Sequence, residues 1–409
     1  MTDALVIGAG MVGVATALAL QARGRDVVLV DRREAGRETS YGNAGLIQAE
    51  AVEPYAFPLE PSAVFGIALK LTNDVNWHLT ALPAYAGPLV RYLWHSTPAH
   101  HQAISQVYGP LIRRATADHE PLIEAAGAGN LITKDGFVQA YRTNESMDAG
   151  ARDAEHVNKE FGVGMRLLSA KALAAEEPQL KRPMAGGVHW TEAWACSSPG
   201  SLVAAYLALF EKRGGTFATG DAASLEEAGA GWRVTTADGP VEASDAVVAL
   251  GPWSQQCLAR FGYAVPLFRK RGYHRHYAMA TPLRRAFMDT ASGVVCAPMQ
   301  AGMRITTGAE LAAFDAPATP RQLRRAERTV AELFDFGEPV EAEPWLGNRP
   351  CMPDMLPVVG KAPRHPGLWF HFGHGHQGFT LGPTTAALLA EDMSGEGVNP
   401  LAAKLAYRF

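Results

Sequence analysis

Blocks of apolar residues, separated by polar and glycine positions, predict a strand, a helix and a second strand at the start of the chain. Ala4 to Ile7 is a short apolar run, which is typical of a strand buried on both faces. The segment from Met11 to Arg23 predicts a helix that ends at Gly24, and Val27 to Val30 predicts the next strand. We therefore expect the chain to open with a β-α-β unit.

The turn between the first strand and the helix carries three glycines with the spacing G-x-G-x-x-G. Gly8 permits the tight turn, Gly10 lets a pyrophosphate approach the backbone, and Gly13 lets the helix pack closely on the strand. The N-terminal N–H groups of the helix would face the phosphates. Asp31 ends the second strand, where its carboxylate can accept hydrogen bonds from ribose hydroxyls and disfavours NADP. This order of features indicates a dinucleotide site, and a β-α-β packing unit without a ligand is the alternative.

Helices and strands continue to alternate through the rest of the chain. The patterns predict helices over residues 102–126, 146–161, 169–177, 320–334 and 384–394, and another that ends near Arg213. They predict strands over residues 186–191, 216–219, 232–236, 241–249 and 368–372, with 263–310 rich in strands. Residues 130–141 are typical of a hairpin with Asp135-Gly136 at the turn.

The composition of the 409 residues fits an ordinary globular protein, with 47% hydrophobic and 19% charged residues. This length favours two domains over one core. A net charge of −4 provides no basic field, so we expect no nucleic-acid partner. The four cysteines are scattered and predict neither a disulfide framework nor a metal site, which fits a reducing compartment.

The start of the chain and its hydropathy bear on where the protein works. A strand that begins at residue 4 leaves no room for a signal peptide, and no run of about 18 apolar residues predicts a membrane-spanning helix. We therefore expect a cytoplasmic protein. The apolar and aromatic segment from Leu79 to Trp94 is expected to pack in a cap domain, and peripheral contact with the inner face of the membrane is the alternative.

Four segments outside the N-terminal unit carry further motifs. Residues 38–45 (Glu-Thr-Ser-Tyr-Gly-Asn-Ala-Gly) form a small, polar stretch whose backbone can approach a flat ring, although a plain surface loop is the alternative. Residues 249–254 read Ala-Leu-Gly-Pro-Trp-Ser, residues 347–360 match G-x-R-P-x-x-P-D-x-x-P-x-x-G, and residues 373–380 match G-H-G-x-x-G-x-T. With these motifs the chain resembles the FAD-dependent D-amino-acid dehydrogenases of the D-amino-acid oxidase and glycine oxidase superfamily.

The resemblance implies an α/β fold with a discontinuous, Rossmann-like FAD-binding domain and an α+β substrate (cap) domain with a mixed sheet. Because the nucleotide-type segments lie at both ends and in the middle of the chain, residues 1–75, 191–258 and 341–409 are assigned to the FAD-binding domain. Residues 76–190 and 259–340 would form the substrate domain.

The resemblance also implies FAD, bound noncovalently, and no metal. In related sarcosine oxidases a cysteine tethers the flavin, but that cysteine lies further upstream of the Pro-Asp pair than Cys351 does. The residues expected to contact FAD come from the N-terminal unit and from the motifs above: Gly8, Gly10, Met11, Val12, Gly13, Asp31, Arg32, Thr39, Ser40, Asn43, Ala44, Gly45, Leu46, Gly251, Trp253, Gly375, Gln377, Gly378 and Thr380.

An amine-oxidising flavoenzyme must bind a carboxylate, hold an uncharged amine and aim the α-hydrogen at flavin N5. Arg349 is the first candidate for the carboxylate, because its guanidinium matches a carboxylate bidentately and it lies where the family has its carboxylate arginine. A structural ion pair is the alternative role, and Arg304 and Arg271 are the next candidates. The turn from Gly378 to Gly382, before the last helix, would stabilise the negative charge that reduction leaves on the flavin.

Residues 269–277 (Arg-Lys-Arg-Gly-Tyr-His-Arg-His-Tyr) are dense in cations and aromatic rings. As a strand, this segment would place alternate residues from Arg271 to Tyr277 on one face and the two histidines on the other. One face would line the substrate cavity, with Tyr273 as the favoured contact. An exposed charged strand is the alternative.

The function implied is oxidation of an amino acid, either a D-amino acid or an N-substituted one, by hydride transfer from the α-carbon to flavin N5. The imine that results would be hydrolysed. His376 and Gln377 stand where many relatives have small or apolar residues, and His376 is a catalytic candidate as a donor to substrate or flavin. His374, which lies between two glycines, is a second candidate donor, and a structural role is its alternative. Alternatives are a flavin-bearing electron-transfer subunit of a hetero-oligomeric amine, opine or hydroxyproline dehydrogenase, and an NAD-dependent dehydrogenase. The chirality of the substrate and the electron acceptor (quinone, redox protein or oxygen) stay open.

Overall fold

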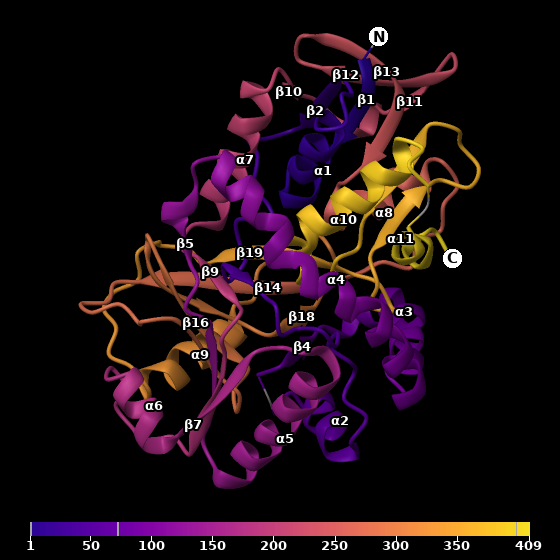
Figure 1. Ribbon diagram of the computed structural model, residues 1–409. Coiled ribbons are helices and arrows are strands. Elements are labelled where there is room, and N and C mark those ends of the chain that lie inside the picture. Colours follow the sequence, from indigo (N-terminus) through magenta and orange to yellow (C-terminus); the bar gives the residue numbers. More distant parts are fainter. Residues whose placement is uncertain (1, 72, 398) are drawn as a thin grey trace.

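The computed structural model describes residues 2–71, 73–397 and 399–409 and has an α/β architecture with two large sheets. In Figure 1 the first sheet occupies the upper part of the molecule and the second crosses the lower part. Helices α10 (Gly378–Met393) and α4 (Pro98–Ala125) pack against each other near the middle. The predicted fold class is confirmed.

The first sheet joins strands from separate stretches of the chain and is parallel at its centre. Its order is β10-β2-β1-β13-β12-β11, β21 pairs with β13, and β20 pairs with β21. The pairs among β10, β2, β1, β13 and β21 are parallel, and the others are antiparallel. In the described residues its eight strands are β1 (Thr2–Ile7), β2 (Val27–Asp31), β10 (Thr216–Thr219), β11 (Glu226–Ala228), β12 (Gly231–Thr236), β13 (Gly239–Val248), β20 (Val358–Lys361) and β21 (Leu368–Phe372).

The N-terminal β-α-β unit lies where the pattern predicts it. Strand β1 lies between β2 and β13, and Ala4 to Ile7 are fully buried, as a run of apolar residues requires. Helix α1 (Met11–Gln21) follows, and Gly24 turns the chain with a φ of +77°.

The second sheet is mixed, as the resemblance implies. Its order is β4-β18-β14-β17-β16-β15-β6-β8-β7, with β19 paired to β14; the pairs β15–β6 and β18–β4 are parallel. In the described residues its ten strands are β4 (Val75–Trp77), β6 (Phe137–Tyr141), β7 (Met165–Ser169), β8 (Gly186–Trp190), β14 (Phe268–Tyr277), β15 (Ala286–Asp289), β16 (Val294–Met299), β17 (Gly302–Thr306), β18 (Ala309–Leu311) and β19 (Trp345–Cys351). The domain boundaries drawn from the sequence stay a prediction, and β19 joins this sheet from the last of the segments assigned to the FAD-binding domain.

The predicted hairpin over residues 130–141 is wrong. Its first half forms β5 (Ile132–Thr133), which pairs with β9 (Trp194–Cys196) in a small sheet that also includes β3 (Leu46–Ile47), whereas β6 pairs with β8 and β15. Gly136 does turn the chain, with a φ of +77°. The turn is therefore local, but distant segments supply the partners of both strands.

The remaining helices connect and cover the sheets. They are α2 (Pro61–Ala68), η1 (Leu79–Ala81), α3 (Leu82–His95), η2 (Gly129–Leu131), α5 (Asn144–Phe161), α6 (Ala170–Glu176), α7 (Pro199–Lys212), η3 (Ala222–Ser224), η4 (Gly251–Trp253), α8 (Ser254–Ala259), α9 (Arg321–Ala331) and α11 (Pro400–Leu405). Of the helices in the described ranges, none combines the length and apolar character needed to cross a bilayer.

Helix α10 begins at Gly378 and not at Thr384, so the predicted glycine turn is wrong: those residues are already helical, and α11 follows as a later helix. Gly378 and Gly382 lack side chains, which allows α10 to contact α1. A Cβ on Gly382 would lie 2.8 Å from Met11 Cγ, and a Cβ on Gly378 would lie 3.7 Å from Val12 Cγ2. The two helices therefore approach closely at their N-terminal ends, and Figure 1 shows yellow α10 beside indigo α1.

A buried histidine replaces a hydrogen bond that proline removes from α10. Pro383 lacks the N–H that would bond to the carbonyl of Phe379. His119 of α4 supplies the donor, because its Nε2 lies 3.0 Å from Phe379 O, and its Nδ1 lies 3.0 Å from the hydroxyl of Tyr206. Burial lowers the pKa of His119 to about 4, so the neutral ring donates at Nε2 and accepts at Nδ1.

Strand β14 is buried on both faces, so the interpretation of residues 269–277 as an exposed charged strand is wrong. Arg271 forms an ion pair with Glu310 at 3.1 Å, and both side chains are almost fully buried. On the opposite face the ring of His274 stacks on Trp345 with centroids 4.9 Å apart. The charge of Arg271 is tolerated in this buried strand because Glu310 is its buried partner.

We predict that His119→Gln weakens the pH dependence of folding. In the unfolded wild type His119 has a pKa near 6.5, whereas in the folded protein its pKa is about 4. The stability that the neutral ring contributes is therefore fully present above pH 6.5 and is lost as the pH falls toward 4. This group alone should remove about 2 kcal/mol of the free energy of unfolding between pH 7 and pH 5.

Unfolding curves at both pH values test this, with His156→Gln as the exposed control. The stability difference between the wild type and His119→Gln should narrow by that amount at pH 5. A difference that stays constant would show that His119 is not held neutral.

Candidate functional site

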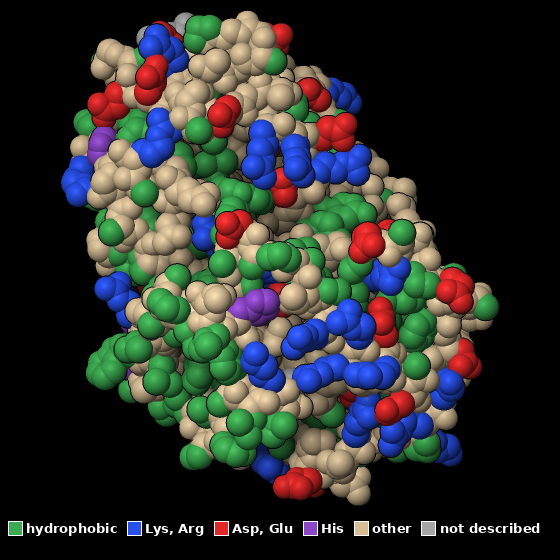
Figure 2. Space-filling view, turned by 180° about the vertical axis from the view of Figure 1, so that it is seen from behind, with side chains coloured by type: hydrophobic (Ala, Val, Ile, Leu, Met, Phe, Trp, Pro, Cys, Tyr) green, Lys and Arg blue, Asp and Glu red, His purple; other side chains and the backbone are tan. Residues whose placement is uncertain are grey.

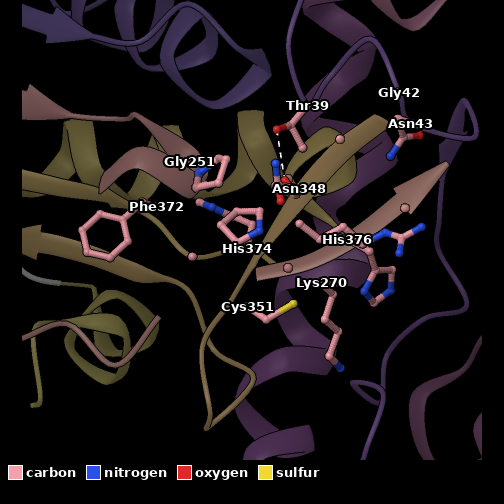
Figure 3. Close-up of a pocket in the computed structure, with 18 of the residues that line it drawn as sticks. Thr39, Gly42, Asn43, Gly251, Lys270, Asn348, Cys351, Phe372, His374 and His376 are labelled. Atoms are coloured by element: carbon pink, nitrogen blue, oxygen red, sulfur yellow. Dashed lines mark hydrogen bonds between the residues drawn. The ribbon is translucent and has the colours of Figure 1, made fainter. Parts of the chain in front are cut away.

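A cavity of about 910 Å³ is lined by residues of both large sheets. This volume lies at the upper end of the range for small-molecule and cofactor sites. Figure 3 shows its central part, where Thr39, Asn348, His374, His376, Lys270 and Cys351 surround the same space.

The N-terminus of α1 forms one end of the cavity. A Cβ on Gly8 would lie 2.5 Å from Ala249 O, and a Cβ on Gly13 would lie 1.7 Å from Gly8 O, so this packing needs glycine at both positions. The N–H of Met11 donates to Ser40 Oγ at 2.9 Å. The first N–H of the helix and a hydroxyl thus meet where a phosphate would bind.

The next part of the cavity lies beyond the end of β2. Oδ2 of Asp31 accepts a hydrogen bond from the N–H of Ala9 at 2.7 Å, and burial raises the pKa of this carboxyl. The guanidinium of Arg32 lies 4.6 Å from the ring centroid of Trp253, and Gly251 lines the cavity beside it. An acceptor for ribose hydroxyls and an aromatic wall are therefore in place.

Segment 38–45 crosses the middle of the cavity and is held there by the second sheet. Thr39 Oγ1 donates to the carbonyl of Asn348 at 3.1 Å (Figure 3). Arg304 donates through Nη1 to the carbonyl of Tyr41 at 3.0 Å and to that of Asn43. Arg304 does not line the cavity, so the structure gives it an anchoring contact rather than access to a ligand.

The start of α10 also holds this part of the chain. Thr380 Oγ1 donates to the carbonyl of Leu46 at 3.2 Å and accepts from the N–H of Gln48 at 3.3 Å. Gln377 Nε2 donates to Gln48 Oε1 at 2.6 Å. Both predicted cofactor residues act on the segment that would contact the flavin, and neither lines the cavity.

Most of the predicted cofactor residues line the cavity, and four do not. Gly13 and Gly45 pack against backbone, and Gln377 and Thr380 bond as just described. Those that line it are Gly8, Gly10, Met11, Val12, Asp31, Arg32, Thr39, Ser40, Asn43, Ala44, Leu46, Gly251, Trp253, Gly375 and Gly378. Their roles toward FAD stay predictions.

A chain of amides fixes the orientation of His376. The buried carboxylate of Glu50 accepts from Gln48 Nε2 at 2.6 Å, which leaves Gln48 Oε1 to accept from Gln377 Nε2. Gln377 Nε2 lies 3.1 Å from His376 Nε2, so that ring nitrogen accepts and Nδ1 carries the proton. Burial, together with two nearby cations, lowers the pKa of His376 to about 3, and its ring lies 4.8 Å from that of Tyr55.

The glycine turn before α10 carries a second neutral histidine. Gly373 and Gly375 have φ values of +85° and +59°, which only glycine adopts freely. His374 between them lies 3.0 Å from Thr385 Oγ1, and burial lowers its pKa to about 3. The ring is therefore tied to α10, which matches the structural alternative for His374.

Of the three predicted arginines, Arg349 lines the cavity and the other two do not. Its guanidinium donates to the carbonyls of Thr307 and Gly308, each at 3.1 Å, and no carboxylate in the described parts of the chain pairs with it. Gly272 leaves it room, since a Cβ there would lie 2.7 Å from Arg349 Nη2. Burial lowers the pKa of Arg349. Two of its five N–H groups are used, and three remain for a ligand.

Tyr273 lines the cavity, but its hydroxyl is already in use. It donates to Glu310 Oε2 at 2.7 Å and accepts from Arg271 Nη2 at 3.0 Å and from the N–H of Thr319 at 2.8 Å. One donor and two acceptor positions are all that a phenol offers. The structure therefore ties this hydroxyl to the Arg271–Glu310 pair, and a catalytic role for Tyr273 stays a prediction.

Sequence reasoning missed three residues that line the cavity next to Arg349. Lys270 comes from β14, Tyr92 from α3, and Tyr55 precedes α2. Lys270 lies in the cation-rich segment 269–277, but on the face of the strand opposite Arg271 and Tyr273. The strand alternation could have identified it, whereas nothing local marks the two tyrosines.

The residues present fit FAD. The cavity extends from the glycine-rich start of α1, past Asp31, to the glycine turn at Gly373, which is the layout that an ADP half and a ring system need. Two helix N-termini, those of α1 and α10, meet its wall through Met11 and Gly378. In the described residues no cluster of three His, Cys, Asp or Glu side chains could hold a metal.

The model of the family described as FAD dependent oxidoreductase (DAO) matches residues 3–392. The chain is 31% identical over 405 residues to the D-amino-acid oxidase of Bradyrhizobium diazoefficiens, covering 96% of this chain and 94% of that protein. It is 32% identical over 414 residues to a D-amino acid dehydrogenase of Cereibacter sphaeroides, covering 96% and 91%.

Solved structures share the fold. The glycine oxidase of Geobacillus kaustophilus superposes with a TM-score of 0.73 at 22% identity, covering 100% of this chain and 99% of that one. The L-amino acid deaminase of Proteus vulgaris superposes with a TM-score of 0.74 at 16% identity, covering 100% and 97%.

We predict that acid precipitation releases the flavin into the supernatant. Cys351 lines the cavity, but burial raises the pKa of its thiol, so the nucleophilic thiolate is disfavoured. Absorbance of supernatant and pellet measures this, and Cys351→Ser should bind the same amount of flavin. A yellow pellet from the wild type, and not from Cys351→Ser, would show covalent attachment at this residue.

Proposed function

Since the chain belongs to the family of FAD-dependent oxidoreductases, we propose that this enzyme oxidises D-amino acids or N-substituted amino acids at the α-carbon. One observation carries the proposal: Arg349 lines the cavity with three free N–H groups and no carboxylate partner in the described residues. A half-buried guanidinium in a cavity without an anion is costly, and a substrate carboxylate would compensate it. The two relatives that are 31% and 32% identical are named for D-amino acids, which supports a D-amino acid over an L-amino acid.

The residues around Arg349 would orient the rest of the substrate. Because the carbonyls of Thr307 and Gly308 fix the guanidinium, it can hold a carboxylate in one orientation. His376 stays neutral and presents an Nδ1–H. The substrate amine must be uncharged to form a double bond to the α-carbon, and a cavity rich in cations favours the neutral amine.

When bound, FAD supplies the redox chemistry by accepting two electrons and one hydrogen from the α-carbon. The product imine then reacts with water to give a 2-oxo acid and an amine or ammonia. The N-terminus of α10, at Gly378, would place its positive end toward the ring system and stabilise the negative charge that reduction creates.

We predict that Arg349→Ala lowers kcat/KM about a hundredfold per bound flavin, which corresponds to about 3 kcal/mol of lost transition-state binding. Arg349→Lys should recover little, because an ammonium cannot reproduce the two-pronged contact. The assay is amino-acid-dependent reduction of an artificial dye, normalised to flavin content.

Lost flavin or a lower melting temperature with unchanged turnover per flavin would instead assign Arg349 a structural role. Arg321→Ala, on the exposed surface of α9, controls for loss of an arginine outside the cavity.

The same assay distinguishes a complete enzyme from the alternative function, a flavin-bearing subunit of a hetero-oligomeric dehydrogenase. The purified chain should reduce the dye by itself if it is a complete enzyme. Binding of flavin without amine-dependent turnover would favour the subunit. The family membership does not support the third reading, an NAD-dependent dehydrogenase.

We also propose that the enzyme works at a membrane surface. Large apolar side chains gather on the outside of α2, η1 and α3, and Figure 2 shows this surface as a green area at the lower left. Its members are Leu59, Val64, Phe65, Leu69, Leu71, Leu79, Val90, Leu93 and Trp94. Here we call it the α2–α3 surface; large exposed apolar side chains that gather in one place are typical of an interaction site.

Neighbouring charge favours an anionic lipid bilayer as the partner. Helix α9 carries four exposed arginines, and one of them, Arg325, donates to the carbonyl of Lys70 at the end of α2. Basic residues beside an apolar surface are typical of interfacial binding. The inner side of the same segment, at Phe57, Ile67 and Tyr92, lines the cavity, so an acceptor dissolved in the bilayer would arrive beside it.

We predict that the protein sediments with vesicles that contain anionic phosphatidylglycerol and less with neutral vesicles. Phe65→Glu with Leu79→Glu should abolish this binding, because these side chains are 62% and 74% exposed on the α2–α3 surface. Val340→Glu, at an exposed apolar side chain outside that surface, should not affect it. Equal sedimentation of the double variant and the wild type would contradict membrane contact at this surface.

A further inference from the structure

Two cationic residues that line the cavity stand at paired positions of neighbouring strands. In the pairing of β14 with β19, Lys270 stands directly opposite Arg349, so both side chains leave the same face of the sheet. Like charges opposite each other destabilise a sheet. This pair therefore needs a compensating negative charge.

The described residues do not supply that charge. Neither Lys270 nor Arg349 forms an ion pair with a carboxylate in the described parts of the chain. Lys270 Nζ donates to the hydroxyl of Tyr92 at 3.2 Å and lies 4.3 Å from the centroid of that ring. Glu50, a buried carboxylate of this region, bonds to the amide of Gln48.

The two charged groups point apart along the sheet. The guanidinium of Arg349 extends over Gly272 toward Thr307, whereas the ammonium of Lys270 lies on the side of Tyr92 and 5.5 Å from the ring centroid of Phe268. Since Phe268 and Gly272 lie on opposite sides of Lys270 along β14, one carboxylate on Arg349 would leave Lys270 unpaired. The geometry favours two anionic groups.

A third donor lies beside the pair. His376 is close enough to Arg349 and Lys270 for both to lower its pKa, and Figure 3 shows its ring and the Lys270 side chain next to one another. Its Nε2 is occupied by Gln377, so Nδ1–H is the group left for a ligand. The free N–H groups of Arg349, Lys270 and His376 can all donate hydrogen bonds, and none of them can accept one. They therefore suit a ligand that only accepts, such as a carboxylate.

We propose that the substrate carries two carboxylates: the α-carboxylate on Arg349 and a second one on Lys270, with His376 Nδ1–H as an additional donor. This rests on the proposed function and names its substrate class. With an uncharged amine, a monocarboxylate brings one negative charge into a site with two cations, whereas a dicarboxylate brings two. The second carboxylate can belong to an acidic side chain or to an N-carboxyalkyl group.

Matched substrates test the proposal on the holoenzyme. D-glutamate and D-aspartate are compared with D-glutamine and D-asparagine, which have the same shape without the charge, and N-(carboxymethyl)glycine is compared with N-methylglycine. We expect kcat/KM for the diacids of one arm to exceed that of their neutral partners at least about tenfold. The arm that shows the preference identifies where the second carboxylate is attached.

Lys270→Met keeps the length of the side chain and removes its charge. It should lower kcat/KM for the preferred diacid about tenfold or more and leave the neutral substrates within about twofold. Lys70→Met is the matched control, because Lys70 makes a similar contact, 4.3 Å from the ring centroid of Trp77, and does not line the cavity.

Binding without turnover gives a second measurement that does not depend on the variant folding. Perturbation of the flavin spectrum of the wild type should show glutarate binding at least about tenfold more tightly than butyrate. Equal binding of the two acids, or equal rates for diacids and amides, overturns the proposal. So does an equal loss for all substrates in Lys270→Met, which would place Lys270 on the α-carboxylate.

A result that contradicts the proposed function differs from one that contradicts only the second carboxylate. In that case the yellow protein oxidises no amino acid of any charge, while the comparison of glutarate with butyrate still reports on Lys270.

Discussion

The close approach of α1 and α10 is the contact on which the site depends. The N-terminal ends of both helices line one cavity, and the small Gly382 lets the backbone of α10 lie against Met11. A larger residue there would separate the two helices and, with them, the two positive helix ends that line the cavity. Pro383 near the start of α10 removes one backbone hydrogen bond from this helix. His119 compensates for the lost bond, because it supplies the donor to Phe379 O.

The opposite wall of the cavity depends on a second close pairing, that of β14 with β19. It places Arg349 over Gly272, where the missing side chain makes room for a guanidinium held by two carbonyls. The other face of β14 satisfies its own charge through Arg271 and Glu310. The two paired strands thus carry two kinds of cation. Arg271 of β14 is neutralised by a carboxylate within the protein, whereas Arg349 of β19 has no carboxylate partner in the described residues.

What the sequence predicted well is local. The β-α-β unit depends on neighbouring residues, and so does Gly13, which packs on Gly8 O, so pattern and spacing suffice to place them; Gly8 also packs against the distant Ala249. The errors involve partners far away in the chain. The turn at Gly136 is real, but its two strands join different sheets, and α10 starts at Gly378 because α1 and α4 support its first turns. Strand alternation alone places Lys270 on the face opposite Arg271, but only the register with β19 shows that it stands opposite Arg349.

The chain of amides from Glu50 to His376 links the two halves of the site. Gln48 follows the segment that crosses the middle of the cavity and Gln377 precedes α10, so the hydrogen bond between them forms only when both are in place. That bond leaves His376 Nε2 as an acceptor and directs its proton to Nδ1. A protonated imidazole would add a third positive charge beside Arg349 and Lys270, whereas the neutral ring adds a donor without charge. The same bonds that position the segment predicted to contact the flavin therefore set the protonation of His376, the residue proposed to face the substrate.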